Sequence, residues 1–371
     1  MELFDVIVVG AGPAGATAAR TLGARGLSVL VMERYSFPRS KPCAGWISPW
    51  VLELIGVTPD QYANRGTLVS FSSLIVWDGR NVGREVKFDQ IKGYGIIRSE
   101  FDASLVSLMK NVRFAEDSPV RDITRHTGTV TINGRYRAPV VIGAGGHNCP
   151  VARKFGRIRP DERYVTAVVS ETRLGRDVIN SLTPHPDIPQ VIFHDDFTGY
   201  GWYFPKGDYL NIGVGTTSAE RLTSHRDALM LRLKKGGMLP DRKRYPLNAF
   251  TGHAYKLMRI SPRRLCSGGI LLAGDAAGIA YNMSGEGIGP AVFSGLCAAE
   301  TILAANGDYS PRSLTDYPRL LYARFGAPYP EKLISALSLI PGFLSPLVRL
   351  SAVTSRTTRR HLVARRWFFR D

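Results

Sequence analysis

The sequence has few cysteines and no long apolar run, and both absences exclude whole classes of protein. Its four cysteines lie far apart and form no CxxC pair, which argues against a structural zinc site and a secreted disulfide framework. No stretch approaches the roughly 18 uncharged apolar residues of a transmembrane helix. Asp5 interrupts the apolar start and no basic segment precedes it, so a signal peptide is not expected. These observations favour a cytoplasmic protein, and no cluster of histidine, cysteine and carboxylate residues predicts a metal site.

Acidic residues are also scarce relative to basic ones. There are 31 of them against 48 lysines and arginines, which gives a formal net charge of +17. Such an excess favours an anionic partner, which can be a phospholipid surface, a nucleic acid or an acidic substrate, or it is simply a solvated basic face. Nucleic acid is the least favoured partner, because no recognition fold accompanies the charge. The hydrophobic fraction of 44% over 371 residues is enough for two closely packed domains.

The first 35 residues read as the start of a dinucleotide-binding fold. Residues 4–9 form an apolar, β-branched run that predicts a buried strand, residues 13–25 predict an alanine-rich helix, and residues 27–33 predict a second strand. A loop is predicted for residues 36–50, which are dense in proline, glycine and serine. Residues 99–110 predict a helix opened by Ser99.

The turn between the first strand and the first helix reads G-x-G-x-x-G. Gly10 allows the tight turn, Gly12 lets a pyrophosphate approach the backbone, and Gly15 lets the helix pack against the strand. The helix N-terminus offers free N–H groups and a positive dipole end to the phosphates. Glu33, at the end of the second strand, stands where a carboxylate accepts hydrogen bonds from ribose hydroxyls and would repel a 2′-phosphate. The motif predicts a dinucleotide site but does not choose between FAD and NAD.

The rest of the chain changes character twice. From about residue 160 to 260 the pattern alternates, as in antiparallel strands, and residues 270–273 and 287–304 then predict a buried strand and a helix rich in small residues. The predicted fold class is α/β, with a Rossmann-like FAD-binding domain interleaved with an antiparallel-sheet substrate domain, plus a helical basic C-terminus. The predicted boundaries are 1–75, 95–160 and 262–310 for the FAD-binding domain, 76–94 and 161–261 for the substrate domain, and 311–371 for the C-terminal region.

A second glycine-rich signature favours FAD over NAD. Asp275 follows a buried strand, where it can bond the ribityl chain of a flavin nucleotide. The glycines from Gly285 to Gly289 would bring the N–H groups of a helix start to the electron-rich pyrimidine end of an isoalloxazine. A positive helix end at that place stabilises the anionic reduced flavin.

The sequence resembles the geranylgeranyl reductase family, within the flavoproteins similar to p-hydroxybenzoate hydroxylase. Four blocks carry the likeness, and the third, which is close to the family's YxWxFPK signature, is the most discriminating: GAGPAG at 10–15, KPCAGWISP at 41–49, GYGWYFPKGDYLNIGVG at 199–215 and GDAAG…SGEGI at 274–288. Two departures bear on the subfamily and so on the substrate. Tyr281-Asn282-Met283 stands where the family has a proline-containing turn, and Ala144-Gly145-Gly146 stands where it has Ala-Asp-Gly.

The resemblance implies a set of site residues. FAD contacts are implied at Ala14, Glu33, Cys43, Gly45, Arg98, Asp275, Gly287 and Ile288, with Val120 as an adenine-side contact. Together with the two glycine motifs, the candidate cofactor-binding residues are Gly10, Gly12, Pro13, Ala14, Gly15, Glu33, Arg34, Cys43, Ala44, Gly45, Arg98, Val120, Gly274, Asp275, Gly285, Gly287 and Ile288. The candidate substrate residues are Trp46, Tyr200, Trp202, Phe204 and Pro205.

The resemblance implies reduction of carbon–carbon double bonds in a prenyl-type lipid, with hydride transfer from N5 of the reduced flavin. Tyr200, Trp202 and Phe204 share one face of a strand and fit an apolar tunnel wall, or they are ordinary core residues. Cys43 is the candidate catalytic residue, as a proton donor or a group that tunes the flavin, or it only packs under the ring. His147, His194 and Glu286 are further possible proton carriers, or have structural roles.

Two other functions stay open at this stage. One is a flavin monooxygenase or tailoring enzyme acting on an aromatic molecule or peptidyl group, and the other is a flavin-containing maturation or binding protein. The electron donor is NADPH or a ferredoxin. The last residues mix arginines with Trp367, Phe368 and Phe369, which predicts peripheral contact with an anionic membrane on its inner face, or else a solvated positive face.

Overall fold

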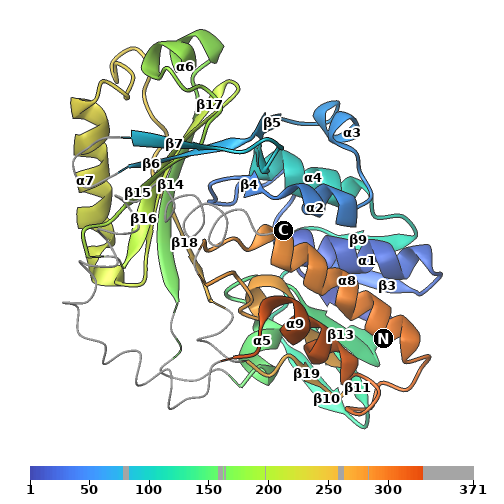
Figure 1. Cartoon of the computed structure of the whole chain (residues 1–371). Helices are drawn as coiled ribbons and strands as arrows, with labels where there is room; N and C mark the ends of the chain where they lie inside the picture. Colours follow the sequence, from blue (N-terminus) through green and yellow to red (C-terminus); the bar gives the residue numbers. More distant parts are fainter. Residues whose placement is uncertain are drawn as a thin grey trace.

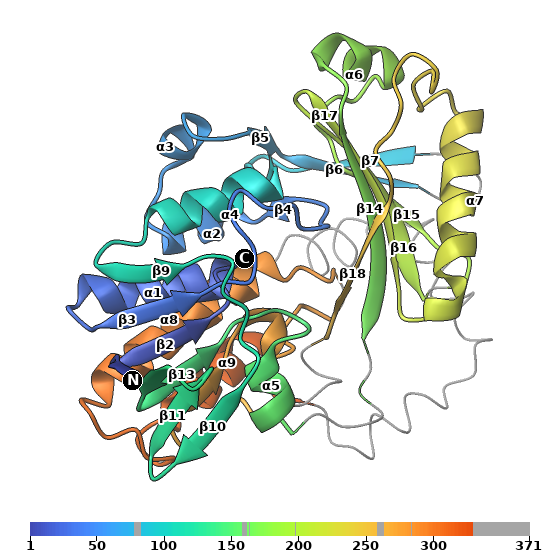
Figure 2. The ribbon, with the colours of Figure 1, turned by 180° about the vertical axis from the view of Figure 1, so that it is seen from behind.

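The computed structural model describes residues 1–77, 83–157, 162, 164–196, 198–257, 263–282 and 284–328. These residues form two bodies that lie side by side, each built on a large β-sheet (Figure 1). The view from behind shows the same arrangement, with a group of helices above the sheet of one body (Figure 2). Those helices are α2 (Pro49–Leu54), α3 (Pro59–Ala63) and α4 (Arg98–Ser107).

The first body contains a six-stranded sheet in the order β19-β20-β13-β2-β3-β9. All of its neighbouring strands are parallel except β19, which pairs antiparallel with β20. The strands are β2 (Val6–Val9), β3 (Val29–Met32), β9 (Val112–Ala115), β13 (Val140–Gly143), β19 (Cys266–Ser267) and β20 (Ile270–Leu272). The central strands are fully buried runs of valine, isoleucine and leucine, as is typical of a parallel sheet that is covered on both faces.

Helices and a smaller sheet pack on this parallel sheet. Helices α1 (Pro13–Ala24) and α8 (Ile288–Ala304) lie side by side, so close that a methyl group on Gly295 would come 2.1 Å from the carbonyl oxygen of Ala14. The smaller sheet has the order β1-β12-β11-β10 and shares the same apolar core. Its strands are β1 (Glu2–Leu3), β10 (Ile123–His126), β11 (Thr129–Ile132) and β12 (Tyr136–Ala138). Two shorter helices complete the body, α5 (Pro150–Phe155) and α9 (Asp316–Phe325).

The second body is a seven-stranded sheet in the order β18-β14-β17-β16-β15-β6-β7, antiparallel except for the parallel pair β15 and β6. Its strands are β6 (Ser73–Trp77), β7 (Gly83–Lys87), β14 (Val165–Arg173), β15 (Gln190–Phe193), β16 (Gly199–Lys206), β17 (Tyr209–Thr216) and β18 (Thr251–Tyr255). Helix α7 (Leu222–Lys235) lies along the outer face of the sheet, and α6 (Arg176–Leu182) lies at one end (Figure 1). Leu229 and Leu233 of α7 pack against Tyr203 and Ile212 of the sheet.

A three-stranded sheet connects the two bodies. It consists of β4 (Trp46–Ile47), β5 (Leu68–Phe71) and β8 (Gly93–Ile96), in the order β4-β8-β5. The chain leaves the first body here, contributes β6 and β7 to the large antiparallel sheet, and returns through β8. The predicted α/β class, in which a parallel-sheet domain is interleaved along the chain with an antiparallel-sheet domain, is confirmed. The predicted domain boundaries stay a prediction.

Local differences from the sequence expectations have simple physical causes. Helix α4 begins at Arg98 with Ile97 at the N-cap, so the expected cap at Ser99 is wrong, and the buried ion pair of Arg98 takes precedence over capping propensity. The expected loop at 36–50 ends early, because Trp46 and Ile47 pair with β8 and Pro49 starts a helix. Helices α6 and α7 were not expected within the antiparallel region.

The arginine-rich end at 349–371 lies outside the described residues. Within the described part of the chain, no helix combines the length and apolarity that a membrane span needs.

Candidate functional site

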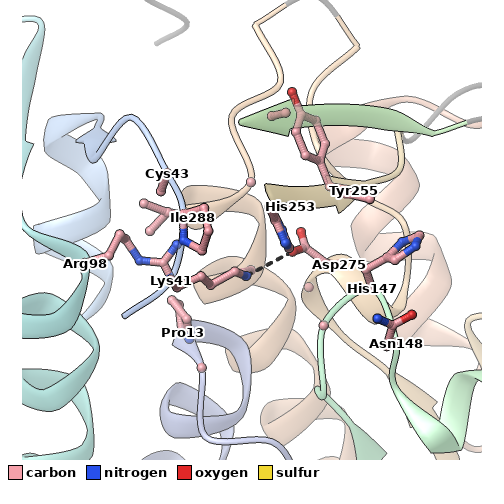
Figure 3. Close-up of a pocket in the computed structure, with 18 of the residues that line it drawn as sticks. Pro13, Lys41, Cys43, Arg98, His147, Asn148, His253, Tyr255, Asp275 and Ile288 are labelled. Atoms are coloured by element: carbon pink, nitrogen blue, oxygen red, sulfur yellow. Dashed lines mark hydrogen bonds and ion pairs between the residues drawn. The ribbon is translucent and has the colours of Figure 1, made fainter. Parts of the chain in front are cut away.

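A single large cavity of about 850 Å³ lies where the two bodies face each other. Its lining comes from the glycine turn after β2, the loop before β4, the turn after β20, the turn that leads into α8, and the inner face of the large sheet (Figure 3). All the predicted cofactor-binding residues line it except Gly15 and Gly45, and all the predicted substrate residues line it except Pro205. The structure therefore brings together residues separated by more than half of the sequence.

The glycine turn is held closed by backbone contacts. Gly10 has a φ of +102°, and a methyl group placed there would come 2.5 Å from the carbonyl oxygen of Ala144 at the end of β13. A methyl group on Gly15 would come 1.9 Å from the carbonyl oxygen of Gly10. Gly15 therefore has the packing role that the motif predicts and does not line the cavity.

Gly12 has a different environment. Its nearest neighbour within reach of a methyl group is Arg39 Nη2, at 3.5 Å, and its surface is open to the cavity. Gly12 is also the N-cap of α1, where no side chain caps the free N–H groups. This open, uncapped helix start fits a pyrophosphate, which needs close backbone approach and N–H donors.

Glu33 lies at the end of β3 with 6% of its surface exposed. Its Oε2 accepts a hydrogen bond from the Ala11 N–H at 2.9 Å, and its Oε1 accepts from the Arg34 N–H at 3.0 Å. A carboxylate has about four acceptor positions, so this fixed group can still accept from ribose hydroxyls. Arg34 and Val120 line the same end of the cavity, which is the end expected to hold an adenosine.

Asp275 is the acceptor in a partly buried polar cluster. Its Oδ2 accepts from Lys41 Nζ at 3.1 Å and lies 3.3 Å from His253 Nε2 (Figure 3). Burial alone would raise the pKa of Asp275, but Lys41 and His253 outweigh it and hold the pKa well below its ordinary value. Burial lowers the pKa of His253, so the imidazole is neutral near pH 7. The ionised carboxylate beside the cavity fits the acceptor that a ribityl hydroxyl needs.

The start of α8 faces the same cavity. Gly287 is its N-cap without a side-chain cap, and Gly285 has a φ of +69°, a conformation that favours glycine. Gly285, Gly287 and Ile288 all line the cavity. A helix of 17 residues directs its positive end here, which suits the pyrimidine end of an isoalloxazine.

Cys43 lies near two hydrogen-bond donors, one of which is positively charged. Its Sγ accepts from the Gly45 N–H at 3.3 Å, and its side chain interacts with the guanidinium of Arg98. Arg98 is 4% exposed and is held by Asp102 through two hydrogen bonds, of 3.0 and 2.8 Å. Arg98 therefore keeps a fixed positive charge beside the cysteine sulfur, on the side of the cavity shown at the left in Figure 3.

The inner face of β16 forms an aromatic wall. Tyr200, Trp202 and Phe204 alternate along the strand and all line the cavity, as their spacing predicts. Phe204 is also a core residue, 1% exposed, and its ring packs against Phe71 and Trp46, with centroids 5.5 and 6.3 Å away. Phe204 therefore both lines the cavity and belongs to the core, and its role as a substrate residue stays a prediction. Pro205 is buried and is not part of the cavity lining.

The candidate proton carriers separate into two groups. His147 and Glu286 line the cavity, and the buried Nδ1 of His147 has no hydrogen-bond partner among the described residues. His194 lies elsewhere: it stacks on His225 with ring centroids 3.8 Å apart, and burial, followed by the charge of His225, lowers its pKa to about 4. Its assignment as a site residue finds no support in the cavity.

The polar cavity residues that sequence reasoning missed include Lys41, His253 and Tyr255. Lys41 opens the KPCAG block that carries the family likeness, so a signal for it existed. His253 and Tyr255 lie on β18 in an ordinary alternating strand, where nothing local marks them. Burial raises the pKa of Tyr255, so its hydroxyl stays protonated. Within the described ranges, no group of three or more histidine, cysteine or acidic residues could hold a metal ion, and the four cysteines carry free thiols.

Comparisons with known proteins agree with this geometry. Residues 5–86 match a family model described as FAD dependent oxidoreductase. An uncharacterized protein of Methanosarcina barkeri is 30% identical over 81% of this chain and 75% of its own length. The geranylgeranyl diphosphate reductase of Synechocystis is 28% identical over 88% of this chain and 83% of its own length.

A solved structure gives the same fold. The geranylgeranyl bacteriochlorophyll reductase-like protein of Thermoplasma acidophilum superposes with a TM-score of 0.78 at 21% identity, covering 98% of this chain and 95% of the other. The relatives, the motif at residues 10–15 and the cavity that joins two glycine turns all point to the same cofactor. The chain belongs to the geranylgeranyl reductase family of FAD-dependent oxidoreductases.

Proposed function

We propose that the protein reduces carbon–carbon double bonds of a prenyl-type lipid. The observation that carries this proposal is the continuity of the cavity: the surfaces that fit FAD continue without a break into a wall of Trp46, Tyr200, Trp202 and Phe204. An isoprenoid chain has few polar groups, so an apolar aromatic wall is the surface that would hold it. The relative from Synechocystis, whose name specifies a geranylgeranyl substrate, supports the same choice.

The reaction needs a hydride at one alkene carbon and a proton at its neighbour. The bound flavin supplies the hydride when it is reduced. The protein's part is to press the alkene against the flavin, to exclude water and to deliver the proton. Cys43 and Tyr255 both line the cavity and both carry a transferable proton, with Arg98 beside the cysteine. We assign the proton to one of these two side chains.

The test is anaerobic turnover. The purified, FAD-loaded protein is reduced with dithionite and given geranylgeranyl diphosphate or a prenyl quinone, and the products are weighed by mass spectrometry. We expect the gain of two hydrogen atoms for each bond reduced, in the absence of oxygen. Gain of one oxygen atom, with oxygen consumption that depends on substrate, would instead establish a monooxygenase. NADPH and reduced ferredoxin, tested side by side as replacements for dithionite, identify the electron donor.

A peripheral membrane position is part of the proposal. It is supported by the basic and aromatic residues of the sequence between 349 and 371 and by the net charge of +17. Flotation with anionic liposomes should recover the full chain and lose the chain that lacks residues 355–371. Equal recovery of both chains would remove the membrane from the proposal.

A further inference from the structure

The loop that carries Cys43 is attached to the opposite body of the protein by a buried lysine. Lys206, the last residue of β16, has a fully buried side chain. Its Nζ donates to the carbonyl oxygens of Ala44 at 2.9 Å and Ile96 at 2.8 Å. Its third N–H group donates to Glu171 Oε1 at 2.7 Å. All three N–H groups of the ammonium are therefore used.

Asn211 on β17 makes a second attachment to the same loop. Its amide group donates to the carbonyl oxygen of Cys43 at 2.8 Å and to Glu171 Oε1 at 2.8 Å. Its Oδ1 accepts from the indole N–H of Trp202 at 2.7 Å. One buried amide thus contacts both the backbone of the cysteine and the side chain at the centre of the aromatic wall.

The surrounding glycines show that space is reserved for this network. A methyl group on Gly45 would come 2.4 Å from Lys206 Nζ, and one on Gly213 would come 2.2 Å from the Trp202 ring. Gly45, which was expected to contact the cofactor, lies instead behind the cavity wall against the lysine. Such a cluster is costly to bury, and well-packed apolar residues of the same volume would stabilise a core at least as well. Stability alone therefore does not account for its presence.

We propose that Lys206, Asn211 and Glu171 are positioning residues that fix the Cys43 loop, residues 41–45, to the aromatic wall, so that the cysteine thiol and the Trp202 indole are placed as one unit. The three residues come from β14, β16 and β17 of the large sheet, whereas the loop belongs to the other body. The distance between thiol and wall is thereby set by side-chain bonds that cross between the two bodies. This inference holds for any substrate of the cavity and does not depend on prenyl reduction.

The test uses the chemistry of the four cysteines. The FAD-loaded full chain is treated with iodoacetamide, and alkylation of each cysteine is followed by mass spectrometry of its peptide. In Asn211→Leu and Lys206→Met we expect Cys43 to react about 5- to 10-fold faster than in the native chain, because the loop opens more often. Cys266, which is partly exposed, should keep its rate, and the buried Cys149 and Cys297 should stay protected.

Two further variants separate positioning from general stability. Tyr203→Phe is the matched control, since this buried residue of β16 packs on the α7 side of the sheet and should leave the Cys43 rate unchanged. The paired variant Lys206→Met/Glu171→Leu removes both charges together, which avoids leaving one charge buried alone. It should keep Cys149 and Cys297 protected while Cys43 still reacts faster. An unchanged Cys43 rate in the paired variant, or equal acceleration of all four cysteines in it, overturns the proposal.

Discussion

The two sides of the cavity are built by different means. On the parallel-sheet side, glycine turns present backbone N–H groups, and contacts such as Gly15 against the Gly10 carbonyl leave no room for a single methyl group. On the antiparallel-sheet side, the surface consists of side chains, held by bonds such as that between Trp202 and Asn211. The parallel-sheet side depends on local chain geometry, so a single substitution there should cause a large loss of stability or of bound FAD. The second depends on contacts between distant residues and should lose function by degrees.

The largest effect is expected from a methyl group in the glycine turn. In Gly15→Ala the new carbon would overlap the Gly10 carbonyl oxygen, so unfolding free energy should fall by about 3 kcal/mol and bound FAD should be lost. Gly12→Ala is the matched control, because its methyl group fits the fold but enters the space open to the cofactor. We expect its stability to change by less than about 1 kcal/mol and its FAD affinity to fall at least about 10-fold. Urea unfolding measures the free energy of unfolding, and flavin absorbance measures the bound FAD. A fully stable, yellow Gly15→Ala protein would contradict the described turn.

On the other side, Trp202→Ala should separate substrate handling from cofactor binding. The indole forms the centre of the aromatic wall and bonds Asn211, but it touches none of the glycine turns. We expect kcat/KM for a prenyl substrate to fall about 100-fold, which corresponds to about 2.7 kcal/mol, while FAD affinity stays within a factor of about two. Fluorescence titration with FAD and steady-state turnover give the two values. Equal losses of both would mean that the two sides of the cavity are not independent.

On both sides of the cavity, the sequence alone predicted the features that leave a local spacing in the chain. Gly10, Gly12, Gly15 and Glu33 lie where the motif predicts, because backbone constraints leave a local spacing in the sequence. The alternation of Tyr200, Trp202 and Phe204 likewise predicted a shared face.

What the sequence could not show are contacts between residues far apart in the chain. His253 meets Asp275 only because β18 packs beside the turn after β20, and Lys206 reaches Ala44 across 162 positions. No pattern within a strand reports such a partner. The same reason explains why the sequence did not reveal that Gly45 packs against a lysine on another sheet.

A smaller effect is expected at the ribose end. In Glu33→Gln the side chain keeps its size but loses its charge and part of its acceptor capacity. The Ala11 N–H can still be bonded, so the fold should be intact, and FAD affinity should fall about 10-fold, or about 1.4 kcal/mol. Isothermal titration with FAD and with FMN makes the comparison sharper, because FMN lacks the adenosine. The substitution should leave FMN affinity unchanged, and an equal loss for both ligands would place Glu33 outside the adenosine site.

The last effect should be a pH dependence of stability that is confined to the antiparallel-sheet body and leaves cofactor binding unchanged. The native pKa of His194 is about 4, below its ordinary value of 6.5, because the ring is buried and faces His225, with the Gly215 carbonyl and the carboxylates of Asp196 and Asp195 partly compensating. The unfolded chain therefore binds a proton between these values that the native chain does not, so stability falls as pH decreases through this window. Between about pH 7.5 and pH 5 the loss should be about 2 kcal/mol. His194→Gln should remove this loss of stability, as measured by urea unfolding at both pH values. FAD affinity depends on the other body, so it should show the same pH dependence in the native chain and in the variant. A pH slope that persists in the variant would assign the titration to a different group.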